Sequence, residues 1–193
     1  MSSPVLRLRT IPYSVNAVIG EFGTGKTNLL TAIAKVNDGK RRIFANFTLY
    51  EMEFDPIDID DLAEFPEWVH DCVILLDEGH VGANIYDVFE ERIHDFAEFI
   101  TQIRKRKVFI FFTTQFFDRV AKPLRIYTKY IFLMEPTQYE GVSYVSLLDK
   151  NNPERPIYSN KIFDGRPYWN YYDTTEIIHR KKKQEKTQKP LTT

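Results

Sequence analysis

This sequence of 193 residues has only one cysteine, no long hydrophobic run and a net charge close to zero. The single cysteine, Cys72, excludes a disulfide framework within the chain and is typical of a protein from a reducing compartment. The unbroken apolar runs, such as 73–76 and 108–112, are too short to cross a membrane. The first residues hold no apolar stretch of the length that a signal peptide requires. We therefore expect a soluble protein with no transmembrane segment and no signal peptide, in which Cys72 is a small core residue.

The net charge of −1 hides two charged blocks. Residues 51–67 hold eight acidic side chains and no Lys or Arg, whereas residues 179–193 hold six basic side chains against one acidic. Such blocks are usually solvated faces or disordered tails, although a basic tail also suits a protein that binds a phosphate backbone. A chain of this length fits one domain, which we assign to residues 1–176, followed by a basic tail at 177–193.

Apolar runs alternate with helical patterns along the first two thirds of the chain, as in an α/β protein. The patterns predict strands at 14–19, 42–47, 72–76 and 108–114, and helices at 26–36, 87–103 and 117–126, with a short helix at 60–64. Residues 129–176 form a β-rich part with a hairpin of strands 130–134 and 143–148. The aromatic segment 157–172 is expected to be a last strand or arm that packs on the core. We therefore expect a mostly parallel central sheet flanked by helices, with a C-terminal β-hairpin and arm.

The strongest motif is a phosphate-binding loop between the first predicted strand and the first predicted helix. It matches G-x-x-x-x-G-K-[ST], the Walker A pattern, with the residues Gly20, Glu21, Phe22, Gly23, Thr24, Gly25, Lys26 and Thr27. Glycines let successive backbone N–H groups point at phosphates, and the following helix favours anions at its N-terminus. Lys26 would reach the β- and γ-phosphates of ATP, and the Thr27 hydroxyl would coordinate Mg²⁺.

Two acidic residues and a glutamine follow buried strands in the pattern of a Walker B site. Asp77 comes directly after the run Val73-Ile74-Leu75-Leu76, where its carboxylate would hold Mg²⁺ through water. Glu78, the next residue, would polarise the water that attacks the γ-phosphate. Gln115 follows the strand at 108–114, and a polar side chain at that position can sense the γ-phosphate and orient the water. Together with the phosphate loop, these residues predict ATP hydrolysis.

Taken together, these motifs resemble the FtsK–HerA superfamily of DNA-pumping ATPases. The resemblance rests on the phosphate loop, the Asp77-Glu78 pair, Arg104 before the next strand and Gln115 at its end. Arg104 precedes Gln115 by eleven residues, which is similar to the family spacing. The short chain and the late residues 172–176 look most like the genome-packaging ATPases of tailless icosahedral viruses with an internal membrane. Zonular-occludens-toxin-like assembly ATPases of filamentous phages are close relatives of that group.

The resemblance implies a RecA-like P-loop NTPase fold and a homo-oligomeric ring, pentameric or hexameric, around double-stranded DNA. ATP and Mg²⁺ would lie between neighbouring subunits, and Arg104 would be the finger inserted into the adjacent subunit's site. Arg106 is a rival finger at the same strand entry. A capsid vertex or a membrane protein is the expected docking partner, and the host cytoplasm or the packaging vertex of a virion is the expected location.

Several other functions fit the sequence less well. A GTPase would need an Asn-Lys-x-Asp motif, and the only near match, at 160–163, lacks the aspartate. A small-molecule kinase must exclude water and so has no use for Glu78 as a water activator. Two further alternatives stay open: an extrusion ATPase of a filamentous phage and a non-viral HerA-like DNA pump.

Overall fold

An eight-stranded sheet forms the centre of the computed structural model, which describes residues 11–58, 61–62, 65–67, 69–78, 95, 97–120 and 122–173. The strands are β1 (Val15–Gly20), β2 (Arg42–Ala45), β3 (Asp55–Pro56), β4 (Cys72–Leu76), β5 (Val108–Thr114), β6 (Thr128–Pro136), β7 (Val142–Asp149) and β8 (Tyr158–Asp164). Their order across the sheet is β3-β2-β4-β5-β1-β6-β7-β8. Pairing is parallel from β3 to β6 and antiparallel from β6 to β8. The predicted mostly parallel sheet with a C-terminal hairpin and arm is confirmed.

Burial explains which strands lie at the centre. Every residue of β4 and β5 is buried, and both sequences are nearly continuous apolar runs, as expected for parallel strands covered on both faces. Over its first seven residues β6 alternates buried and half-buried positions, the period-two pattern of a strand with one core face. Cys72 is fully buried in β4, which confirms its interpretation as a core residue.

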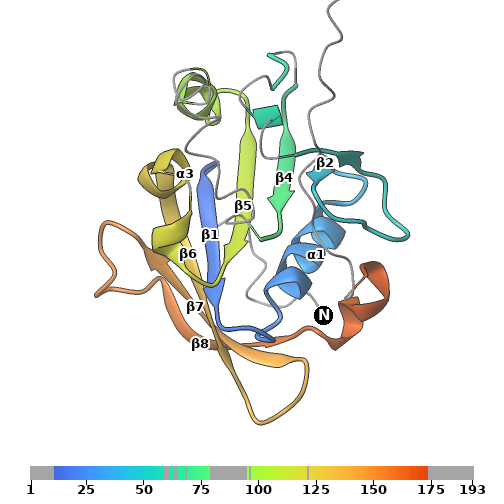
Figure 1. Ribbon diagram of the computed structural model, residues 1–193, viewed down its shortest axis with the longest axis vertical. Coiled ribbons are helices and arrows are strands. Elements are labelled where there is room, and N and C mark those ends of the chain that lie inside the picture. The colour runs from blue at the N-terminus through green and yellow to red at the C-terminus, as the bar shows by residue number, and fades with distance from the viewer. Residues whose placement is uncertain are drawn as a thin grey trace, which may run out of the picture.

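The helices cover the sheet on both faces. On one face α1 (Lys26–Asn37) buries Leu29, Leu30 and Ile33 in a cluster with strand residues of β1, β2 and β4 to β8. On the other face Phe99, Ile100 and Ile103 join a second cluster of buried side chains. Figure 1 shows α1 beside the short 3₁₀ helix η5 (Arg166–Tyr171, red), which follows β8. No helix within the described ranges is long and apolar enough to cross a membrane.

Most predicted elements are present, and the differences have local causes. The helix expected at 117–126 is instead a 3₁₀ helix, η4 (Phe117–Arg119), and a short α-helix, α3 (Lys122–Tyr127). The buried Val120 ends η4 in an extended conformation, and Pro123 belongs in the first turn of a helix rather than in its interior. The strand expected at 42–47 ends at Ala45, and the side chain of the next residue, Asn46, bonds the backbone of Asp77.

The remaining helix predictions are met only in part by the described residues. Residues 97–102 of the helix expected at 87–103 are helical, whereas positions 79–94 lie outside the described residues. Of the short helix expected at 60–64, residues 61–62 form a 3₁₀ turn and the other positions lie outside as well. The aromatic segment 157–172 forms β8 and η5, and Phe163 is buried with Tyr168 stacked on it. The prediction that this segment packs on the core is confirmed.

Candidate nucleotide-binding site

The carboxyl ends of β1, β4 and β5 meet at one edge of the sheet, where a cavity of about 710 Å³ opens. Lys26 and Thr27 of the phosphate loop line it, together with Asp77, Glu78 and Gln115. Ligands of open α/β sheets bind at this edge, because loops from several strands converge there. The structure thus brings together eight predicted site residues from three separate segments, namely these five with Phe22, Gly23 and Gly25.

The phosphate loop is already curled around its lysine. Gly23 and Gly25 have φ values of 77° and 76°, a left-handed conformation that only glycine adopts without strain. The ammonium of Lys26 donates hydrogen bonds to the backbone carbonyls of Gly20, at 3.1 Å, and Glu21, at 2.8 Å. Burial lowers the pKa of Lys26, and the negative charges of Asp77 and Glu78 partly oppose that effect. Phosphate oxygens are acceptors as well, so a phosphate group can replace these carbonyls as the partner of the Lys26 ammonium.

A chain of hydrogen bonds joins the phosphate loop to both acidic residues. The Thr27 hydroxyl donates to Asp77 Oδ2 at 2.8 Å. The hydroxyl of Thr113, near the end of β5, donates to Asp77 Oδ1 at 2.5 Å and accepts the backbone N–H of Glu78 at 2.8 Å. Both oxygens of the Asp77 carboxylate are therefore oriented, and Thr113 holds Asp77 and Glu78 in one arrangement.

The backbone of Asp77 is held by Asn46, the residue that follows β2. The Asn46 side chain accepts the N–H of Asp77 at 2.7 Å and donates to its carbonyl at 2.9 Å. Glu78 has a φ of 49°, and a left-handed conformation is unfavourable for a residue with a side chain. Such strain persists only where surrounding contacts determine the conformation, and it is concentrated at functional sites. Here those contacts come from Asn46 and Thr113.

The two candidate arginine fingers occupy different environments. Arg104 is exposed in the turn before β5, at the amino end of that strand, and does not line the cavity. Arg106 is buried, with 4% of its surface exposed, and donates to the carbonyls of Val69 and Pro66. The rings of Phe65 and Phe99 lie 5.4 and 5.0 Å from its guanidinium. Burial of Arg106 and its bonds to these carbonyls count against it as a finger and leave Arg104 as the exposed candidate.

The far end of the cavity is built from the C-terminal part of the chain. The turn between β6 and β7 and the residues Trp169, Tyr172 and Asp173 line it. Burial raises the pKa of Tyr172 to about 12, and the charge of Asp77 contributes to this rise. The Ser143 hydroxyl at the start of β7 donates to the carbonyl of Thr24 at 2.8 Å and so ties this part to the phosphate loop.

Sequence reasoning missed Thr113, Asn46 and the cavity lining contributed by the C-terminal part. A weak signal was present for Thr113, since a threonine pair ends an otherwise apolar strand. Asn46 directly follows β2, and the carboxyl end of a parallel strand is where site residues gather. Neither signal names a partner, because the partners lie 36 and 31 residues away in the chain.

The residues fit a Mg²⁺–nucleotide complex by their chemistry. Mg²⁺ prefers oxygen ligands and binds proteins through one or two carboxylates together with substrate phosphates. The Thr27 hydroxyl and the Asp77 carboxylate supply oxygens 2.8 Å apart at the helix N-terminus, and the Lys26 ammonium lies beside the same loop. The donor set thus fits a phosphate chain with a divalent cation.

Comparison with known proteins supports the same fold. No protein-family model matches this sequence, and no curated protein matches it. The N-terminal domain of zonular occludens toxin from Neisseria meningitidis is similar in structure, with a TM-score of 0.56, 14% identity, and coverage of 84% of this chain and 100% of that one. The genome packaging NTPase B204 from Sulfolobus turreted icosahedral virus 2, in complex with ATP-gammaS, has a TM-score of 0.51 and 11% identity, with coverage of 79% and 99%. This chain therefore has the RecA-like P-loop NTPase fold that its sequence predicts.

Proposed function

We propose that this chain is an ATPase of the FtsK–HerA superfamily that moves double-stranded DNA, and that it packages a viral genome into a preformed capsid. The observation that carries the ATPase proposal is the hydrogen-bonded unit of Thr27, Asp77, Thr113 and Glu78 beside Lys26. A fold that only bound nucleotide would have no need to hold an acidic side chain in a strained backbone next to the phosphate loop.

Each site residue has a role in hydrolysis under this proposal. Lys26 would exchange its loop carbonyls for the β- and γ-phosphates of ATP. Thr27 and Asp77 would hold Mg²⁺, which supplies positive charge against the phosphates. Glu78 would accept a proton from the attacking water as its oxygen bonds to the γ-phosphorus and the bond to the β-phosphate oxygen breaks. Gln115, which lines the cavity at the end of β5, would orient that water.

The position of Arg104 supports a ring of subunits. Its turn lies at the amino end of β5, whereas the cavity lies at the carboxyl ends of the strands. Arg104 is therefore badly placed to reach its own subunit's γ-phosphate but is exposed to a neighbour. A guanidinium supplied in this way stabilises the charge of the transition state, an effect of roughly a thousandfold or more. The ring would surround duplex DNA in the host cytoplasm or at the packaging vertex of a virion.

The packaging role and one alternative each have a structural neighbour. B204 is described as a genome packaging NTPase, which favours packaging. The likeness to the zonular occludens toxin domain favours the second candidate, an assembly ATPase of a filamentous phage. Duplex DNA that raises the ATPase rate of the oligomer supports a DNA pump. A rate that duplex DNA leaves unchanged in a confirmed oligomer counts against packaging.

The hydrolytic centre is tested by two substitutions that separate turnover from binding. Glu78→Gln keeps the size of the side chain but removes the base, so we expect ATP binding to persist and turnover to fall on the order of a hundredfold or more. Lys26→Ala should instead weaken nucleotide binding itself. Steady-state hydrolysis and equilibrium binding measure the two effects. Hydrolysis by Glu78→Gln at the parent rate would refute the assignment.

A mixing experiment tests the contribution of Arg104 across the subunit interface. Arg104→Ala and Glu78→Gln proteins should each be inactive alone. Mixed oligomers should regain partial activity, because some interfaces then pair an intact Glu78 with an intact Arg104 from the next subunit. Full activity of Arg104→Ala, or no recovery in oligomers shown to contain both proteins, would show that Arg104 does not act in this way.

A further inference from the structure

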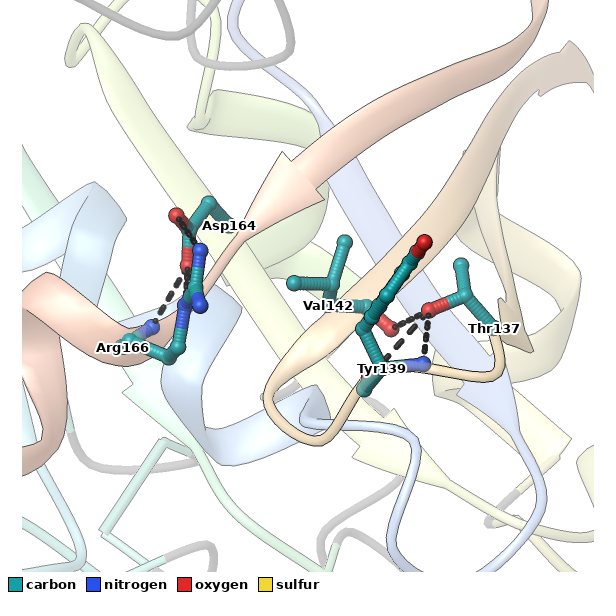
Figure 2. Close-up of polar contacts among 5 residues, drawn as sticks. All are labelled: Thr137, Tyr139, Val142, Asp164 and Arg166. Carbon is teal, nitrogen blue, oxygen red and sulfur yellow. Dashed lines mark hydrogen bonds and ion pairs between the residues drawn. The ribbon is translucent and has the colours of Figure 1, made fainter.

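The cavity extends beyond the phosphate loop to the turn between β6 and β7, which we name the hairpin tip (residues 136–142). Figure 2 shows Tyr139 standing out from this tip between Thr137 and Val142. The Thr137 hydroxyl bonds the N–H of Tyr139 at 3.1 Å and the carbonyl of Val142 at 2.8 Å. These bonds close the turn on itself, so Tyr139 is carried on an ordered support at the cavity edge.

Two aromatic side chains line this end of the cavity and remain accessible. Tyr139 is 64% exposed and Trp169 is 40% exposed, although the aromatic side chains Phe163 and Tyr168 nearby pack on the core. Trp169 rests against Gly141 of the hairpin tip, where a Cβ would lie 2.5 Å from the indole ring. Glycine is thus required at 141 for the indole to approach the tip. Exposed rings that face one cavity are suited to stack on a flat base.

Asn28 supplies a polar group at the same place. It follows Thr27 in the first turn of α1, lines the cavity and is only 3% exposed. Its Oδ1 has no hydrogen-bond partner among the described residues. Buried polar atoms are normally paired, and an unpaired acceptor is costly unless a ligand or water completes it.

The surroundings of Asn28 fix it between the phosphate loop and the hairpin tip. A Cβ at Gly165 would lie 2.7 Å from Asn28 Nδ2, and the N–H of Gly165 donates to the carbonyl of Gly141 at 2.8 Å. Figure 2 shows Asp164 and Arg166, on either side of that glycine, where the Arg166 guanidinium donates to both oxygens of the Asp164 carboxylate. The carboxamide therefore has little room to swing toward a protein partner.

We propose that this end of the cavity is a nucleoside-binding site, in which Tyr139 and Trp169 hold the base and Asn28 Oδ1 accepts a hydrogen bond from the nucleoside. The inference rests on the proposed ATPase function and adds the recognition of the nucleotide's non-phosphate part. The position of Asn28 one residue after Thr27 puts it next to the phosphates, where the sugar begins. The donor is a ribose hydroxyl or the 6-amino group of adenine, and both present the same chemistry to Oδ1.

Nucleotide analogues that each lack one hydrogen-bond donor identify which group of ATP donates to Asn28 Oδ1. We would measure the dissociation constants of ATP, 2′-deoxy-ATP, 3′-deoxy-ATP and purine riboside triphosphate with the parent protein and with Asn28→Ala. One analogue should bind the parent about threefold to tenfold more weakly than ATP, and Asn28→Ala should abolish that difference. Asn37→Ala is the matched control, because Asn37 is equally buried on α1 but its amide is already bonded to Ile33 and Arg41. Ratios that Asn28→Ala leaves unchanged would overturn the role of Asn28.

A second variant, Tyr139→Ala, tests the stacking of the base on the aromatic side chains. Tyr139→Ala removes an exposed side chain, so it tests the proposal even if Asn28→Ala does not fold. We expect all four nucleotides to bind on the order of tenfold more weakly, as for loss of one base-stacking ring. Tyr144→Ala, which removes a tyrosine of β7 that is 41% exposed and outside the cavity, should change nothing. Equal nucleotide affinities for Tyr139→Ala and the parent would overturn the stacking role.

Inorganic triphosphate separates this proposal from the phosphate site on which it rests. Its dissociation constant, measured directly, should be the same for the parent, Asn28→Ala and Tyr139→Ala proteins, and much larger for Lys26→Ala. Triphosphate binding that Asn28→Ala or Tyr139→Ala weakens as much as ATP binding would show a general loss of the cavity and would overturn the nucleoside site. A parent protein that binds no triphosphate would overturn the phosphate site and the nucleoside site together.

Discussion

Thr113→Val isolates the hydroxyl that joins the two acidic residues. Valine has nearly the same shape as threonine, and Thr113 is only 1% exposed, so packing should be conserved while the hydroxyl is removed. The substitution leaves Asp77 Oδ1 and the N–H of Glu78 without the bonds of 2.5 and 2.8 Å that they make in the parent. Hydrogen bonds to charged groups contribute about 1.5–3 kcal/mol and neutral ones about 1 kcal/mol. We therefore expect the free energy of unfolding to fall by about 2.5–4 kcal/mol.

The effect on catalysis should be larger than this loss of stability implies. Without its bond to Thr113, Glu78 is free to leave the left-handed conformation, whose cost is about 1–2 kcal/mol for a residue with a side chain. A displacement of about 1 Å at a reacting group can lower the rate on the order of a hundredfold. We expect kcat for ATP to fall by roughly tenfold to a hundredfold, with a smaller change in KM.

Urea denaturation gives the free energy of unfolding, and steady-state ATPase measurements give kcat and KM. Thr113→Ser keeps the hydroxyl and should retain most of the parent kcat. Thr128→Val is the matched control, because Thr128 is also buried but bonds the carbonyl of Leu124 away from the cavity. It should lower stability by about 1 kcal/mol and leave kcat unchanged. A Thr113→Val protein with the parent kcat would refute the conclusion that Thr113 positions the acidic pair.

Three further predictions follow from burial and charge. Arg106→Lys should lower the free energy of unfolding by about 2–3 kcal/mol, since lysine cannot donate to both carbonyls that the guanidinium bonds. Arg104→Ala should change it by less than about 0.5 kcal/mol, and denaturation curves of the two variants make the comparison. Burial raises the pKa of Cys72 from 9.0 to about 12, so the unfolded chain loses its thiol proton first and stability should fall between pH 9 and 12, by up to roughly 4 kcal/mol. Denaturation at pH 8 and pH 11 should show a smaller difference for Cys72→Ala than for the parent, and an equal difference would contradict this cause. Deleting the residues after His179 should weaken duplex binding and flatten its salt dependence, by a slope of about 0.9 for each phosphate that the tail neutralises, and an unchanged slope would leave the tail as a solvated end.

Local patterns in the sequence predicted most of the fold and the residues of the phosphate loop and the acidic pair. The strand limits at 72–76 and 108–114 agree with the structure, because apolar runs bounded by polar or charged residues mark strands buried on both faces. The phosphate loop and the Asp77-Glu78 pair were found because their chemistry depends on adjacent residues. The topology of parallel strands then dictates that they share one edge of the sheet.

Contacts between strands were beyond the reach of the sequence and were decided by the tertiary structure. The bonds of Asp77 to Asn46 and Thr113 depend on the register of β2, β4 and β5, and a shift by one residue would turn each side chain to the opposite face. Burial likewise distinguished Arg106 from Arg104, although both lie in one basic run, because the rings of Phe65 and Phe99 come from outside that run. The sequence by itself thus predicted which residues would bind and cleave a phosphate chain. Only the packing of distant segments decided which neighbours orient those residues, because that depends on distances in space and not on spacing along the chain.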